Sequence, residues 1–189
     1  RQLGRATKLP ILIYNLPQFA GGVETGVAVD LICNERAVAG VKDSSGSLEI
    51  LTALTARDAA EVIRLPGNDA VLAESIRKGL CQGVISGVAC VLPELIAGLF
   101  AAWEHNAPDV FNKLAVHLDE FIEQLNVLPV PWGLKVVAEA RGLAKATYSM
   151  PLTSNRQKQI QSFDGWFAIW WPEVAELAQT VLSPAAPKP

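Results

Sequence analysis

Four short apolar runs, each followed by a stretch with helical spacing, constrain this chain more than any other feature of its sequence. The runs cover residues 9–14, 37–42, 60–65 and 83–89. Each run ends in residues typical of turns, and the stretches between them place apolar residues at helical intervals. Continuous apolar strands that alternate with helices are typical of a parallel sheet covered by helices. The sequence therefore predicts an α/β fold.

The spacing of the expected strand ends indicates how such a sheet is built. The ends fall at Tyr14, Lys42, Gly67 and near Gly87, in steps of 28, 25 and 20 residues. Steps of this size fit successive βα units of a barrel or of a doubly wound sheet. A complete (β/α)8 barrel needs about 250 residues, whereas this chain has 189. Either a partner covers the two open edges of a half barrel, or the sequence is the C-terminal part of a longer protein.

The pattern changes to helices alone after Pro93. Amphipathic stretches predict helices over residues 94–105, 108–125 and 131–141, and a fourth helical stretch covers residues 155–182. The last of them predicts one broken helix or two. We therefore expect a half barrel over residues 1–106, a helical region over residues 107–183 and a disordered tail over residues 184–189.

Composition narrows the possible functions. Hydrophobic residues make up 50% of the chain and charged residues 19%, which excludes disorder over the whole length. The net charge of -3 comes without a basic block, which argues against a nucleic-acid partner. No apolar run reaches the roughly 18 residues that span a bilayer. The cysteines (Cys33, Cys81, Cys90) lack a Cys-x-x-Cys spacing, which predicts reduced thiols in a cytoplasmic protein rather than disulfides or a zinc site.

The strongest candidate for chemistry is Lys42, at the end of the second apolar run. Burial at a strand end disfavours a charged ammonium. A lysine whose pKa falls to roughly 7–8 can attack a carbonyl and form a Schiff base. The alternative is a lysine that extends from the strand end into solvent. The segment around Lys42 lacks the glycine and lysine spacing of a phosphate-binding loop.

Three other strand ends carry candidate residues. Tyr14 ends the neighbouring strand, where its phenol is placed to relay protons or simply to cap the barrel. Gly67 permits close approach of the backbone to a ligand, while Asp69 nearby is expected to cap the following helix. The small residues around Ile85 leave room for a ligand or allow tight packing of strand against helix.

The ordered segments resemble the dihydrodipicolinate synthase and N-acetylneuraminate lyase family of class I aldolases. The matching segments are Tyr14-Asn15-x-Pro17, Gly40-Val41-Lys42-Asp43, Gly67-Asn68-Asp69 and Gly83-Val84-Ile85-Ser86-Gly87. They occur in the order of the family, and the resemblance covers roughly residues 3–155. Together the four motifs are specific for the family, although each alone is weak.

The resemblance implies a (β/α)8 TIM barrel, of which this chain holds strands 5–8 and the C-terminal helical region. It implies that Lys42 forms a Schiff base with pyruvate or another 2-oxo acid and that Tyr14 relays protons. Ile85 and Gly67 are expected to line the pocket. The resemblance implies a homo-oligomer, usually a tetramer, that needs no metal and no organic cofactor.

One departure from the family pattern concerns the second substrate. Synthases that bind aspartate semialdehyde carry an arginine at the position of Phe19, and phenylalanine cannot pair with a carboxylate. Phe19 therefore favours another aldehyde or a sugar-acid substrate. The expected reaction is cleavage or formation of a carbon–carbon bond between pyruvate and an aldehyde. The alternatives are a dehydratase of a keto-deoxy sugar acid that uses the same lysine, and a non-catalytic half-barrel module.

Overall fold

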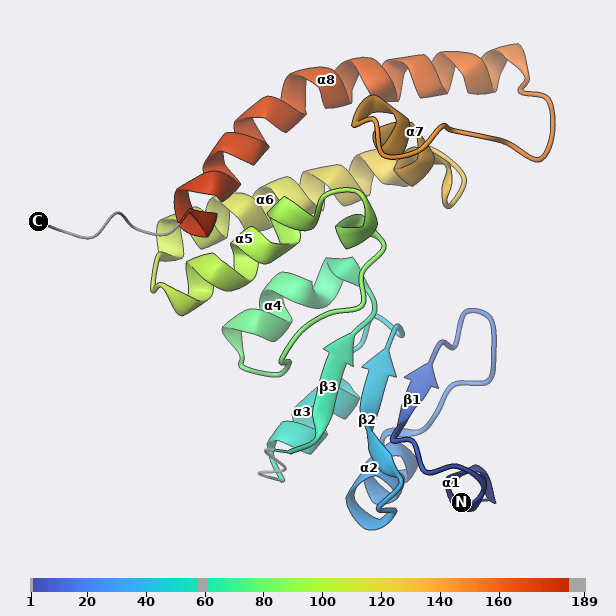
Figure 1. Ribbon diagram of the computed structural model, residues 1–189, viewed down its shortest axis with the longest axis vertical. Coiled ribbons are helices and arrows are strands. Elements are labelled where there is room, and N and C mark those ends of the chain that lie inside the picture. The colour runs from blue at the N-terminus through green and yellow to red at the C-terminus, as the bar shows by residue number, and fades with distance from the viewer. Residues whose placement is uncertain (1, 58–60, 184–189) are drawn as a thin grey trace, which may run out of the picture. The chain divides into compact units, whose positions relative to one another are not determined.

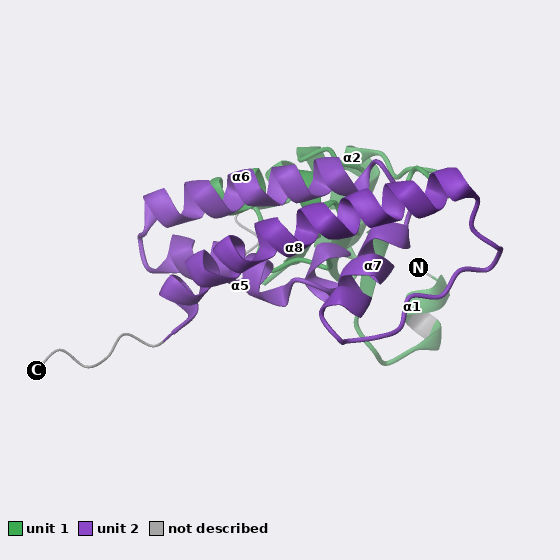
Figure 2. Cartoon of the chain, turned by 90° about the horizontal axis from the view of Figure 1, so that it is seen from above, with its two compact units in different colours: residues 1–86 green, residues 87–189 purple. Residues whose placement is uncertain are grey.

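The protein divides into two compact units, residues 1–86 and residues 87–189 (Figure 2). The computed structural model describes residues 2–57 and 61–183. The predicted tail over residues 184–189 lies outside the described residues, as does the first residue of the run at 60–65.

Unit 1, residues 1–86, contains a parallel sheet of three strands in the order β1-β2-β3 (Figure 1). The strands are β1 (Ile11–Asn15), β2 (Val38–Asp43) and β3 (Ile63–Pro66). Each lies inside or at the end of one of the first three predicted apolar runs. The prediction of a parallel α/β fold is confirmed for these strands.

The predicted fourth strand, over residues 83–89, is wrong. Within this range the structure has a segment without helix or strand, residues 83–87, and then η2, a short 3₁₀ helix over Val88–Cys90. Two backbone hydrogen bonds join the segment to β3, from the Gln82 N–H to the Arg64 oxygen at 3.3 Å and from the Ile85 N–H to the Pro66 oxygen at 3.1 Å. Glycine weakens a strand, and this segment, which contains Gly83, runs beside β3 without forming a ladder.

The remaining elements of unit 1 are helices that follow the strands. They are α1 (Gln2–Ala6), α2 (Thr25–Asn34), α3 (Glu49–Thr55), η1 (Asp69–Val71) and α4 (Leu72–Arg77). Gly79, two residues after the end of α4, has a φ of 63°, which is the left-handed conformation common after a helix end. The expectation that Asp69 caps a helix is wrong, because the Asn68 side chain accepts the Ala70 N–H and caps η1.

The core of unit 1 lies between the sheet and the helices α2 and α3, which cover one face (Figure 1). Its buried members are Ala28, Val29 and Ile32 of α2, Val41 of β2, Ile50, Leu51 and Leu54 of α3, and Leu80. Successive side chains of a strand point to opposite faces. Because Val41 faces the helices, Lys42 projects from the other face of the sheet.

Unit 2, residues 87–189, is helical, as predicted for residues beyond Pro93. Its helices are α5 (Pro93–Glu104), α6 (Pro108–Leu125), α7 (Trp132–Ala140) and α8 (Ser154–Leu182). Helices α5, α6 and α8 pack against one another, and α7 packs against α8. Proline begins α5 and α6, where its missing N–H costs nothing.

Helix α8 is continuous, so the prediction of one broken helix or two is resolved in favour of one helix. It contains Pro172 and curves along its length (Figure 1). Trp166 and Trp170 of α8 stack on Phe121 of α6, with the Trp170 and Phe121 ring centroids 5.4 Å apart. Within the described residues, no helix is both long and apolar enough to cross a membrane.

Candidate active site

The parallel register brings Tyr14 and Lys42 side by side at the ends of β1 and β2. The two residues are direct partners in the strand pairing. The Lys42 ammonium lies over the Tyr14 ring, with Nζ 4.0 Å from the ring centroid. The sequence predicted Tyr14 and Lys42 at strand ends. In the structure the two side chains are in contact on the face of the sheet opposite α2 and α3.

The environment of Tyr14 favours its ionised form. Interaction with the Lys42 side chain is the largest cause that lowers the pKa of the phenol, and the nearby Ser44 hydroxyl lowers the pKa further. Tyr14 is 53% exposed, so the residue is open to solvent. A phenol with a lowered pKa beside an amine can take up and return protons nearer to neutral pH.

Gly67 lies directly against the side chain of Lys42. A Cβ atom at Gly67 would lie 2.1 Å from the Ser44 hydroxyl and 2.7 Å from Lys42 Cε. The Gly67 N–H donates to the Asp43 carbonyl at 2.7 Å, which continues the junction between β2 and β3. A side chain at this position would therefore collide with Lys42 and Ser44, and glycine avoids the collision. The predicted approach of Gly67 to a ligand stays a prediction.

Ile85 lies in the segment without regular structure that is hydrogen-bonded to β3. Its N–H donates to the Pro66 oxygen, one residue before Gly67, and its side chain is 45% exposed. This hydrogen bond places the backbone of Ile85 at the same end of the sheet as Gly67 and Lys42. The predicted pocket residues of unit 1 thus lie at the C-terminal ends of the strands.

Phe19 occupies the loop between β1 and α2. Its side chain is 87% exposed, and its N–H donates to the Leu16 oxygen at 3.1 Å. The Gln18 amide donates to the Ser44 carbonyl at 2.9 Å, so the loop is anchored one residue before Phe19. The structure thus holds the backbone of the loop near the site, while the phenylalanine ring extends into solvent.

Three buried polar residues at the C-terminal ends of the strands were not predicted from the sequence. Asn15, Asp43 and Ser44 are 4%, 2% and 6% exposed. Polar side chains that follow directly on an apolar strand, within the motifs already singled out, are the signal that pointed to them. Buried polar groups usually have hydrogen-bond partners. Asn15 and Asp43 bond to each other at 2.9 Å, whereas Asp43 Oδ2 and the Ser44 hydroxyl are buried without a partner among the described residues.

The described part of the chain contains no group of three or more His, Cys, Asp or Glu side chains placed to hold a metal ion. The groups at the strand ends are an amine, a phenol, a hydroxyl and backbone amides. This set can form a covalent bond to a carbonyl compound and can move protons next to that bond.

Curated proteins of known name are similar to this chain in sequence. The chain is 31% identical over 160 residues to a 4-hydroxy-tetrahydrodipicolinate synthase of Bartonella bacilliformis, a match that covers 79% of this chain and 51% of the relative. Relatives of this name are lyases. The chain spans about half the length of the curated relatives it matches.

Solved structures share the fold. The 4-hydroxy-tetrahydrodipicolinate synthase of Methylacidiphilum fumariolicum SolV matches with a TM-score of 0.77 and 21% identity, over 93% of this chain and 59% of the other. A protein designated KD(P)GA from T. tenax matches with a TM-score of 0.74 and 25% identity, over 92% of this chain and 60% of the other. The three parallel strands and the helices are consistent with a part of the TIM barrel of these enzymes.

The family assignment follows from the extent of the sequence match. The pattern that defines the Dihydrodipicolinate synthetase family covers residues 1–166. This range includes both strand ends that carry Tyr14 and Lys42, the close approach at Gly67, and the segment of Ile85. The chain belongs to the dihydrodipicolinate synthetase family.

Proposed function

We propose that this chain carries the Schiff-base centre of a class I aldolase that acts on pyruvate or a related 2-oxo acid and an aldehyde. The observation that supports the proposal most is the position of Lys42 Nζ, 4.0 Å from the ring centroid of Tyr14. Family membership and the named lyases among the relatives support the same reaction class.

In the proposed reaction, the free amine of Lys42 attacks the carbonyl carbon of the 2-oxo acid and forms a carbinolamine. Loss of water gives an iminium ion, which draws electrons from the neighbouring carbon. Removal of a proton from that carbon gives an enamine, and its attack on an aldehyde forms the carbon–carbon bond. Hydrolysis then releases the product and restores the amine, and cleavage follows the same steps in reverse.

Tyr14 is the proposed proton relay. Formation of the carbinolamine requires the removal of a proton from the attacking nitrogen. Dehydration of the carbinolamine then requires a proton on the oxygen that leaves as water. The phenol lies beside the amine and has a lowered pKa, and general acid–base groups work best with pKa values near the operating pH. We propose that Tyr14 transfers both protons.

Gly67 and Ile85 are the proposed walls of the pocket. The absence of a side chain at Gly67 leaves Lys42 free to meet a substrate carbon, since a Cβ there would lie 2.7 Å from Lys42 Cε. The backbone of Ile85 is held at the adjacent edge by its bond to the Pro66 oxygen. A small, flat 2-oxo acid suits a space bounded by backbone.

Phe19 is the proposed contact to the second substrate. Its exposed ring offers no positive charge to a carboxylate, so we propose an aldehyde of the sugar-acid type rather than aspartate semialdehyde. Pairing with a carboxylate is the role for which a guanidinium group is suited. Assembly into a homo-oligomer stays a prediction.

The test is intact mass after incubation with pyruvate and borohydride, which reduces the iminium ion to a stable amine. We expect one adduct on the wild-type chain and none on Lys42→Arg. Lys78→Arg is the matched control, because Lys78 is exposed and pairs with Glu74 on α4 at 2.6 Å. An adduct that survives in Lys42→Arg would refute the proposed nucleophile.

A non-catalytic module is the second candidate, because the chain spans about half the length of its curated relatives. A folded wild-type chain that forms no adduct at any pyruvate concentration would favour it. Product analysis with a keto-deoxy sugar acid distinguishes release of pyruvate by an aldolase from loss of water by a dehydratase.

A further inference from the structure

A buried hydrogen bond joins the last residues of the two strands that carry Tyr14 and Lys42. Asn15 ends β1, Asp43 ends β2, and the two are direct partners in the strand pairing. The Asn15 amide donates to Asp43 Oδ1 at 2.9 Å. The two side chains are 4% and 2% exposed, so this bond forms away from solvent.

The same two side chains also fix the backbone that follows each strand. Asn15 Oδ1 accepts the Val23 N–H at 3.1 Å, which closes the loop between β1 and α2. Asp43 Oδ1 accepts the Ser45 N–H at 2.9 Å, which shapes the turn after β2. The Asn15 carbonyl accepts the Ser44 N–H at 2.8 Å, a backbone bond between the same two strand ends.

The geometry links this pair to the reactive groups on the opposite face. Tyr14 precedes Asn15 and Lys42 precedes Asp43, and successive strand residues point to opposite sides of a sheet. A bond between Asn15 and Asp43 on the helix-covered face therefore fixes the backbone from which Tyr14 and Lys42 project. The Asn15 amide and the Ser45 N–H both donate to Oδ1 of Asp43, whereas Oδ2 is buried without a hydrogen-bond partner among the described residues. Loss of the Asn15 donor is therefore costly, because an unpartnered carboxylate inside the protein is disfavoured.

We propose that Asn15 and Asp43 are positioning residues, whose buried hydrogen bond holds the Tyr14 phenol and the Lys42 amine at their working distance. This inference rests on the proposed Schiff-base function of Lys42. Neither Asn15 nor Asp43 touches the substrate in this proposal. They act through the backbone of the two strand ends.

The test uses Asn15→Asp, which keeps the shape of the side chain but replaces the donor with a carboxylate that faces Asp43. Asn15→Leu is the second variant, because it removes the bond without adding a buried charge. Asn34→Asp is the matched control: Asn34 donates to Asp30 Oδ1 at 2.8 Å in an exposed pair on α2. Circular dichroism identifies which variants are folded.

The first measurement is the titration of ¹³C-labelled tyrosine by NMR, which needs no substrate. The chain has two tyrosines, and their pKa values shift in opposite directions: Lys42 and Ser44 lower that of Tyr14, and burial and Glu139 raise that of Tyr148. We expect the Tyr14 pKa to return toward its ordinary value of 10.0 in both Asn15 variants. Asn34→Asp is expected to leave both titrations unchanged.

The second measurement is the rate of borohydride trapping as a function of pyruvate concentration. We expect the maximal rate to fall on the order of tenfold in the Asn15 variants, with a smaller change in the pyruvate concentration that gives half the rate, because misplacement affects the reacting geometry first. A merely structural role would lower the amount of folded protein without moving either quantity.

The outcomes separate the two proposals. Folded Asn15 variants that keep the wild-type Tyr14 titration and the wild-type trapping rate would overturn the positioning role. A wild-type chain that forms no adduct would overturn the proposed function of Lys42. The tyrosine titration would then still decide whether Asn15 and Asp43 hold Tyr14 against Lys42.

Discussion

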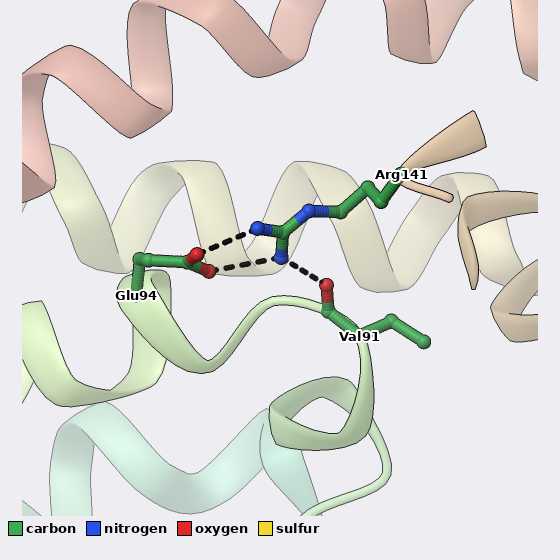
Figure 3. Close-up of polar contacts among 3 residues, drawn as sticks. All are labelled: Val91, Glu94 and Arg141. Atoms are coloured by element: carbon green, nitrogen blue, oxygen red, sulfur yellow. Dashed lines mark hydrogen bonds and ion pairs between the residues drawn. The ribbon is translucent and has the colours of Figure 1, made fainter. Parts of the chain in front are cut away.

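Arg141 and Glu94 form a two-bonded ion pair that ties the end of α7 to the first turn of α5 (Figure 3). Arg141 Nη1 donates to Glu94 Oε2 at 2.9 Å, and Nη2 donates to Oε1 at 2.6 Å. Nη1 also donates to the Val91 carbonyl. The guanidinium carbon lies 4.8 Å from the centroid of the Trp171 ring of α8, so one side chain connects three helices of unit 2.

Glu94→Gln is expected to destabilise unit 2 by about 1–2 kcal/mol, since a hydrogen bond to a charged group contributes about 1.5–3 kcal/mol and a neutral one about 0.5–1.5 kcal/mol. The Arg141 and Glu94 side chains are 18% and 29% exposed. In Glu94→Gln, Arg141 would keep its charge, but the neutral glutamine amide would be a weaker partner than the carboxylate. All five tryptophans lie in residues 87–189, so tryptophan fluorescence during urea unfolding reports this unit. Glu104→Gln, an exposed change at the end of α5, serves as control, and equal losses in both variants would contradict the role of the pair.

Low pH should lower the free energy of unfolding of unit 2 because it protonates the Glu94 carboxylate. Hydrogen bonding to Arg141 lowers the pKa of Glu94 below its ordinary value of 4.5. A carboxyl with a lowered folded pKa stabilises the fold fully above its ordinary pKa, and that contribution is lost as pH falls through the folded pKa. The difference in unfolding free energy between wild type and Glu94→Gln should therefore shrink below pH 4.5. A constant difference between pH 7 and pH 3 would contradict this linkage.

Much of the candidate site could be predicted from the sequence because strand ends in a parallel sheet meet at one edge. The motif order placed Tyr14, Lys42 and Gly67 at that edge, and the apolar runs located β1 and β2 within one residue of their C-terminal ends. Helix α6 matches its predicted bounds because Pro108 begins it and its apolar residues keep a helical period.

The rest depended on interactions between distant segments. The run at residues 83–89 has the apolar character of a strand, yet whether it forms a ladder depends on its register with β3, which composition does not reveal. The burial of Asn15 and Asp43 follows from a contact 28 residues apart in sequence. Asn and Asp are both favourable N-cap residues, and in the structure Asn68 has the N-cap position of η1.

Gly165→Ala is expected to stabilise unit 2 by about 0.5–1 kcal/mol, because glycine inside a helix is less favourable than alanine. Gly165 is an exposed residue within α8, and a Cβ atom there would meet no atom within 4 Å. The urea midpoint by tryptophan fluorescence should rise, with the slope unchanged. A midpoint that stays or falls would indicate that α8 is not a packed, continuous helix at this residue.

Gly67→Ala is expected to abolish or strongly reduce Schiff-base formation. The added Cβ would lie 2.1 Å from the Ser44 hydroxyl and 2.7 Å from Lys42 Cε, so either Ser44 or Lys42 must move. A displacement of about 1 Å at a reacting group costs on the order of a hundredfold in rate. The measurement is the rate of borohydride trapping with pyruvate.

Gly21→Ala is the matched control for this change, because Gly21 lies in the loop after β1 and a Cβ there would meet nothing within 4 Å. Both variants replace a glycine of unit 1 by alanine, so a general effect of the added methyl group would appear in both. We expect the Tyr14 pKa to rise in Gly67→Ala alone, since only that change moves Lys42 or Ser44 from the phenol. Wild-type trapping and titration in a folded Gly67→Ala chain would show that the close approach at Gly67 has no part in the reaction.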